Sequence, residues 1–178
     1  MNNYKTVFFA IGILLIILGA FMLIPFFVQL IYEEQNSTFL SSTFITIFIG
    51  TLLVLTNLEE NRKLNLQQAF LLTALSWLSI AIFGCLPFLL SSLNLSLVDS
   101  FFESMSGITT TGSTVIANLD SAPKGILAWR AILQWLGGIG VIVMTITILP
   151  LLNIGGMQLF RMESSDTTEK ILPKTREV

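Results

Sequence analysis

Long apolar runs, separated by short polar stretches, dominate the chain. The first run, residues 7–32, would extend about 39 Å as a helix, enough to cross a hydrocarbon core of about 30 Å with some tilt. It contains Pro25, a position where a membrane helix can kink. A polar turn at residues 33–37 ends this run, and residues 39–55 form a second run near the lower limit for crossing. The two runs predict a pair of transmembrane helices.

A charged stretch at residues 57–63 is too polar to enter lipid, and it predicts a boundary between two membrane modules. Directly after it, Asn65 and Gln68 have the spacing of a helix capping box, so we expect a third helix from there to about Leu90. The last long run, residues 126–152, predicts a fourth spanning helix. Its three glycines form either a hinge or a close helix contact, and close contact is the more frequent use in membrane helices: Gly137, Gly138 and Gly140.

A half-length apolar segment, residues 97–108, lies between the third and fourth runs. As a helix it would extend only about 18 Å, which is too short to cross a bilayer. Ser96 and Asp99 fit a helix start, because Asp99 would complement the positive end of the helix dipole. We therefore expect a short helix that enters the membrane partway, followed by a polar stretch at residues 109–123.

The composition supports a membrane protein. Hydrophobic residues make up 53% of the chain and charged residues 11%, with a mean hydropathy of +0.82, whereas soluble domains carry about 25% charged residues. The formal net charge of −2 and the lack of a basic cluster argue against a nucleic-acid partner. The chain has no histidine and one cysteine, which excludes histidine-based triads, intramolecular disulfides and zinc sites with several such ligands. The long runs contain no acidic pair for an intramembrane enzyme, so we expect no enzymatic activity.

These patterns predict an all-α membrane protein with about four transmembrane helices, one re-entrant pore helix and a selectivity-filter loop. We expect residues 1–64 to form an N-terminal two-helix hairpin and residues 65–152 a helix, pore-loop, helix repeat. Residues 153–178 would be a cytoplasmic tail or a linker to further repeats. The basic residues of this tail and of the 57–63 stretch fall on one side of a four-helix bundle, so both termini are predicted to be cytoplasmic.

The hydroxyl-rich stretch after the half-length segment carries the candidate chemistry. A cation that leaves water needs closely spaced oxygen ligands, and an extended loop shielded by protein can supply backbone carbonyls. Gly112 allows backbone angles that other residues resist, and the carboxyl end of the preceding helix favours a cation. A plain polar external loop is the alternative, but it gives no reason for the half-length segment.

Two charged residues flank this stretch. Glu103 either lines the outer vestibule or hydrogen-bonds to the loop backbone as pore-helix support, or it is a solvated or salt-bridged carboxylate without a transport role. Arg130, near the outer end of the fourth helix, is expected to be a snorkelling side chain at the membrane interface and not a gate.

Three stretches carry a family resemblance: residues 101–115, residues 129–140 with the Gln134 to Gly140 motif QWLGGIG, and residues 149–161. Through them the chain resembles the Trk/Ktr/HKT superfamily of potassium transporters, and more closely the TrkH/TrkG type of bacterial uptake subunit. The two spanning helices before the pore module look like the additional N-terminal pair of that type.

The resemblance implies a fold of four helix, pore-loop, helix repeats around one ion path in the bacterial inner membrane. It maps the filter of the first repeat, and hence the K⁺ ligands, to Thr110, Thr111, Gly112 and Ser113. It implies K⁺ as the transported ion, no covalently bound cofactor, contact with membrane lipid and a TrkA-type cytosolic nucleotide-binding regulator as partner.

Only one such loop is present, and one loop cannot surround an ion. We therefore expect the chain to be the N-terminal portion of a longer subunit, or the remaining repeats to come from other chains or from a homo-oligomer. The alternative function is a four-helix membrane scaffold or regulatory subunit that moves no ions.

Overall fold

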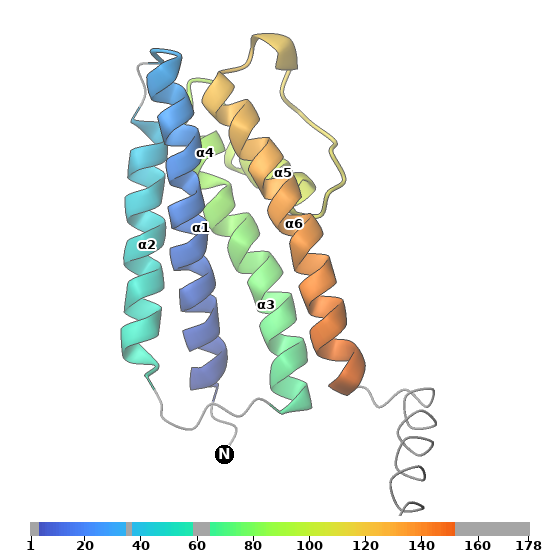
Figure 1. Ribbon diagram of the computed structural model, residues 1–178. Coiled ribbons are helices and arrows are strands. Elements are labelled where there is room, and N and C mark those ends of the chain that lie inside the picture. Colours follow the sequence, from blue (N-terminus) through green and yellow to red (C-terminus); the bar gives the residue numbers. More distant parts are fainter. Residues whose placement is uncertain (1–3, 35–36, 59–64, 152–178) are drawn as a thin grey trace, which may run out of the picture. The chain divides into compact units, whose positions relative to one another are not determined.

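The computed structural model describes residues 4–34, 37–58 and 65–151, and these form helices and connecting loops without any strand (Figure 1). The predicted tail at residues 153–178 and most of the charged 57–63 stretch lie outside the described residues. The chain divides into two units, Met1–Val141 and Ile142–Val178. Residues 142–151, the described part of the second unit, continue the last helix.

Six α-helices and one short 3₁₀ helix make up the described chain. Their bounds are α1 Lys5–Ile31, α2 Thr38–Thr56, α3 Leu66–Gly84, α4 Leu86–Leu89, α5 Leu97–Ile108, η1 Leu119–Ser121 and α6 Lys124–Leu151. Within the first unit, α4 and α5 lie near the end where α6 begins (Figure 1). Within the described residues, four stretches are long and apolar enough to cross a membrane: Lys5–Ile31, Thr38–Thr56, Gln67–Leu89 and Lys124–Ile146. This confirms the prediction of an all-α membrane protein with four spanning helices.

The first two helices pack with their backbones in close contact. A Cβ atom added at Gly12 would lie 2.8 Å from the carbonyl oxygen of Gly50, and one added at Gly50 would lie equally close to that of Gly12. Small residues at such a crossing allow the van der Waals packing that holds helices together in lipid. One face of α1 is buried over four turns, through Val7, Ile11, Leu15, Leu18 and Met22. The opposite faces expose large apolar side chains such as Phe27 and Phe44, as a lipid-facing surface requires.

The third helix begins as predicted but ends early. The Asn65 side chain accepts from the Gln68 backbone N–H at 2.8 Å, and the Gln68 side chain accepts from the Asn65 N–H at 3.0 Å, which completes the capping box. Contrary to the expected single helix to about Leu90, α3 stops at Gly84 and α4 restarts after Cys85. Pro87 explains the break, because it has no N–H to donate to the preceding turn.

The short helix α5 has the predicted bounds. Ser96 caps its first turn, accepting from the Asp99 backbone N–H at 3.1 Å and donating its hydroxyl to the Asp99 carboxylate at 2.6 Å. Along α5, small residues permit close approach: a Cβ atom added at Gly107 would lie 3.0 Å from the Leu133 Cβ of α6. On the other side, a Cβ atom added at Gly84 of α3 would lie 2.6 Å from the Ser104 hydroxyl oxygen of α5. The helix is thus wedged between the α3–α4 break and α6.

Candidate ion-binding loop

Helix α5 ends in a tight reversal that begins the 109–115 loop, defined as Thr109 to Val115. The Thr110 N–H donates to the Gly107 carbonyl at 2.9 Å and the Thr111 N–H donates to the Ser106 carbonyl at 3.0 Å. These two bonds form a Schellman motif, which usually has glycine at the left-handed position. Here Thr110 takes that position with φ +58°, at a conformational cost of about 1–2 kcal/mol. The surrounding structure therefore has to hold the reversal in place.

The reversal turns N–H groups toward the helix and leaves carbonyl oxygens available. The Gly112 N–H also points back to the Ser106 carbonyl, at 3.4 Å, and Gly112 itself has φ +79°. Among the residues that the structure describes, no donor reaches the carbonyl oxygens of Thr110 and Thr111, and both residues are exposed. Oxygen atoms of this kind can replace water around a cation.

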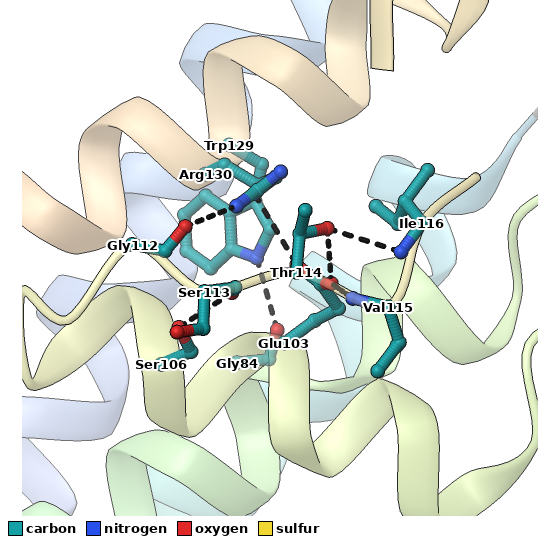
Figure 2. Close-up of polar contacts among 10 residues, drawn as sticks. All are labelled: Gly84, Glu103, Ser106, Gly112, Ser113, Thr114, Val115, Ile116, Trp129 and Arg130. Carbon is teal, nitrogen blue, oxygen red and sulfur yellow. Dashed lines mark hydrogen bonds and ion pairs between the residues drawn. The ribbon is translucent and has the colours of Figure 1, made fainter. Parts of the chain in front are cut away.

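The next two carbonyls of the loop are anchored to protein donors (Figure 2). The Ser106 hydroxyl donates to the Ser113 carbonyl at 2.6 Å, and the Arg130 Nη2 donates to the Gly112 carbonyl at 3.4 Å. Each carbonyl oxygen has two lone pairs, so Gly112 and Ser113 each keep one acceptor position. The four residues predicted as a filter are thus contiguous and exposed, two with open carbonyls and two with partly occupied ones.

Glu103 is the centre of the anchoring contacts. Its side chain is fully buried, and Oε1 accepts from the Thr114 hydroxyl at 2.5 Å and from the Val115 backbone N–H at 2.6 Å (Figure 2). Oε2 lies 3.2 Å from the Arg130 Nε, as an ion pair whose geometry is not that of an aligned hydrogen bond. Of the alternatives for Glu103, the solvated carboxylate is excluded, and the hydrogen bond to the loop backbone is present together with a salt bridge.

The expectation that Arg130 snorkels to the interface is wrong. The residue is only 8% exposed, and its guanidinium group links Glu103 with the Gly112 carbonyl. A buried arginine requires a counter-charge, because desolvation of a lone charge costs several kcal/mol. Glu103 supplies that charge and offsets the positive potential that Arg130 would otherwise impose on the loop.

Two contributors to the site were not singled out from the sequence. Ser106 lies three residues after Glu103, hence on the same face of α5, and that spacing could have indicated it. Trp129, fully buried, donates its indole N–H to the Gly84 carbonyl at 2.9 Å. It thereby joins α6 to the α3–α4 break, a contact for which local sequence gives no signal.

The oxygen atoms of this loop differ from a cluster of metal-binding side chains. Within the described residues no group of three or more His, Cys, Asp or Glu side chains could hold a metal ion. Divalent and transition metals favour such clusters of carboxylate, imidazole or thiolate ligands. The loop instead offers backbone and hydroxyl oxygens, with Glu103 already committed to Arg130 and to the loop.

Comparison with known proteins shows which family this chain belongs to. Residues 35–178 match the TrkH family, described as cation transport protein. The chain is 40% identical over 176 residues to the Trk system potassium uptake protein TrkI of Halomonas elongata, covering 98% of this chain and 36% of that protein. It is 42% identical over 163 residues to the Trk system potassium uptake protein TrkH of Escherichia coli K12, covering 90% of this chain and 34% of that protein.

A solved structure is similar as well. The crystal structure of the potassium transporter TrkH from Vibrio parahaemolyticus matches 93% of this chain and 36% of its own, with a TM-score of 0.82 and 38% sequence identity. The chain therefore spans about a third of the length of the relatives that it matches. The family consists of transport proteins and not of enzymes. By sequence and by fold, this chain belongs to the TrkH family of cation transport proteins.

Proposed function

We propose that this chain supplies one pore repeat of a potassium-uptake subunit in the bacterial inner membrane. The observation that carries the proposal is the 109–115 loop, in which the open carbonyls of Thr110 and Thr111 follow a half-length helix. In this proposal α5 is a re-entrant pore helix, and K⁺ binds at Thr110, Thr111, Gly112 and Ser113. Relatives of the chain are named potassium uptake proteins, which supports K⁺ as the ion.

The contacts around the loop explain how it would bind a dehydrated ion. Carbonyl oxygens bind a dehydrated cation only if their number and spacing replace the water molecules that the ion loses. Ser106 and Arg130 hold the two carbonyls at the far end of the filter stretch, and Glu103 holds the backbone directly after it. The partial negative charge at the carboxyl end of α5 favours the ion at this position.

A single loop covers only part of an ion path, so other repeats must complete it. We propose that residues 65–152 form one helix, pore-loop, helix repeat and that residues 1–64 form a hairpin preceding it. Residues 153–178 would form a cytoplasmic tail or a linker to the remaining repeats. Further segments of a longer subunit, or other copies of the chain, would supply the remaining loops.

The proposed orientation puts both termini in the cytoplasm and the α1–α2 turn outside, with α5 and the 109–115 loop entering the membrane from the outer side. A TrkA-type nucleotide-binding regulator would then bind from the cytoplasmic face.

Potassium-limited growth of an uptake-deficient bacterium tests this function. Cells would express this chain alone, or the complete reading frame that contains it, and ⁸⁶Rb⁺ uptake would be measured in parallel. We expect rescue by the complete reading frame, and rescue by the short chain alone would mean that several copies assemble one pore. Failure of both, with protein present in the membrane, would contradict the proposal and favour a non-transporting scaffold.

A further inference from the structure

The turn between α1 and α2 is tied to the start of α6 by one carboxylate. Glu34 Oε1 accepts from the Lys124 backbone N–H at 2.5 Å, and Oε2 lies 3.3 Å from the Gly125 N–H. These are the first two N–H groups of α6, which have no partner within the helix. A carboxylate at this position also complements the positive end of the helix dipole. The capping group thus comes from a residue about ninety positions earlier in the chain.

Side chains of α1 and α2 also pack closely against the first turn of α6. A Cβ atom added at Gly125 would lie 2.5 Å from the Gln29 Cγ of α1 and 3.1 Å from the Phe39 ring of α2. Gln29 and Phe39 are themselves buried. Gly125 therefore lets the first turn of α6 rest directly on the α1–α2 hairpin, and Glu34 fixes the axial position of that turn.

The contact continues along α6 toward the ion-binding loop. Phe39 of α2 meets the Trp129 ring edge-on, with ring centroids 6.3 Å apart. Trp129 is hydrogen-bonded to the Gly84 carbonyl, and its neighbour Arg130 contacts both Glu103 and the Gly112 carbonyl. All of these residues lie within the first unit, and Trp129 and Arg130 lie within about two helical turns of the end of α6 that Glu34 caps. A shift of α6 along its axis would therefore change the position of Arg130 relative to the 109–115 loop.

We propose that Glu34 is a positioning residue for ion selectivity: by capping α6, it lets the N-terminal hairpin set the position of Arg130 and hence of the Gly112 carbonyl. The inference rests on the proposed function of the loop. It assigns the α1–α2 hairpin a role beyond anchoring in lipid, because the hairpin then determines how rigidly one wall of the ion path is held.

The test compares three variants of the complete subunit that contains this chain. Glu34→Ala removes the cap, Glu34→Gln keeps an acceptor oxygen, and Glu33→Ala removes the neighbouring charge. The Glu33 carboxylate contacts no donor among the described residues, so its loss is a matched electrostatic control. Each variant is assayed for initial K⁺ and Na⁺ uptake, normalised to the amount of subunit in the membrane.

We expect Glu34→Ala to lower the ratio of K⁺ to Na⁺ uptake by up to about fivefold, the equivalent of about 1 kcal/mol for a lost helix cap. Glu34→Gln should stay close to the unmodified protein, and so should Glu33→Ala. A change in ratio, unlike a change in total uptake, does not follow from a reduced amount of folded protein.

A second perturbation avoids the carboxylate. Gly125→Ala pushes the hairpin from α6 with Glu34 intact, while Gly138→Ala, with no atom of the described residues within 4 Å of the added methyl group, is its control. Gly125→Ala should shift the ion ratio in the same direction as Glu34→Ala. An unaltered ratio in both variants, in a subunit that takes up K⁺, would overturn the positioning role and leave the proposed function standing. No K⁺ uptake by the unmodified subunit would instead overturn the proposed function, and this inference with it.

Discussion

Replacing Gly137 with alanine should separate α5 from α6 and disturb the loop that follows α5. The added methyl group would overlap the carbonyl oxygen of Ile108, the last residue of α5, and would lie 2.7 Å from its carbonyl carbon. Carbon atoms in contact are about 3.5–4.0 Å apart, so the two helices must move apart by about 1 Å. Because the atoms in the way belong to the backbone of Ile108, they cannot make room by a side-chain rotation. Overpacking of this kind costs about 1–3 kcal/mol.

The neighbouring glycine provides the control. A methyl group at Gly138 would meet no atom of the described residues within 4 Å, so Gly138→Ala should be neutral or stabilise α6 by up to about 1 kcal/mol. The assay is unfolding of the purified subunit in detergent, followed by circular dichroism, together with ⁸⁶Rb⁺ uptake in cells. We expect Gly137→Ala to lose both stability and uptake, and Gly138→Ala to keep both. Equal behaviour of the two variants would refute the close α5–α6 contact.

Two further changes test the anchoring of the loop. Glu103→Gln keeps the shape of the side chain but leaves Arg130 buried without a counter-charge. We therefore expect the free energy of unfolding in detergent to fall by about 3 kcal/mol. An unchanged free energy of unfolding would contradict the ion pair. Trp129→Phe removes the indole donor to the buried Gly84 carbonyl together with part of a fully buried ring, so it should cost at least about 1–3 kcal/mol in the same assay. Trp135→Phe, at a largely exposed position, should cost less than Trp129→Phe, and an equal loss would contradict the role of the indole bond.

Helix starts were predictable because their signals are local. Ser96 and Asp99 occur three residues apart and bond to each other, and the Asn65 and Gln68 pair does the same, so sequence spacing alone indicated both caps. The break before α4 also has a local cause in Pro87. That signal was present in the sequence, but the strong apolar run outweighed it in the prediction of one continuous helix.

The anchoring of the loop was harder to predict, because it depends on contacts between distant residues. Glu103 and Arg130 are 27 positions apart, and only the packing of α5 against α6 buries them together. For Arg130, position near a helix end favoured an exposed side chain, and tertiary burial reversed that expectation. Positive φ at Gly112 fits its residue type, whereas the same region at Thr110 could not be inferred, since threonine resists it.

The most direct measurement of the central claim is the K⁺ to Na⁺ uptake ratio of a Gly112→Ala variant of the complete subunit. An alanine Cβ has room there, its nearest neighbour being the Gln134 Nε2 at 3.7 Å, so the perturbation comes from the backbone angle of +79°. That angle costs a residue with a side chain about 1–2 kcal/mol. If the loop binds the ion, the ratio should fall while the protein remains in the membrane. An unchanged rate and an unchanged ratio would show that the 109–115 loop does not line the ion path.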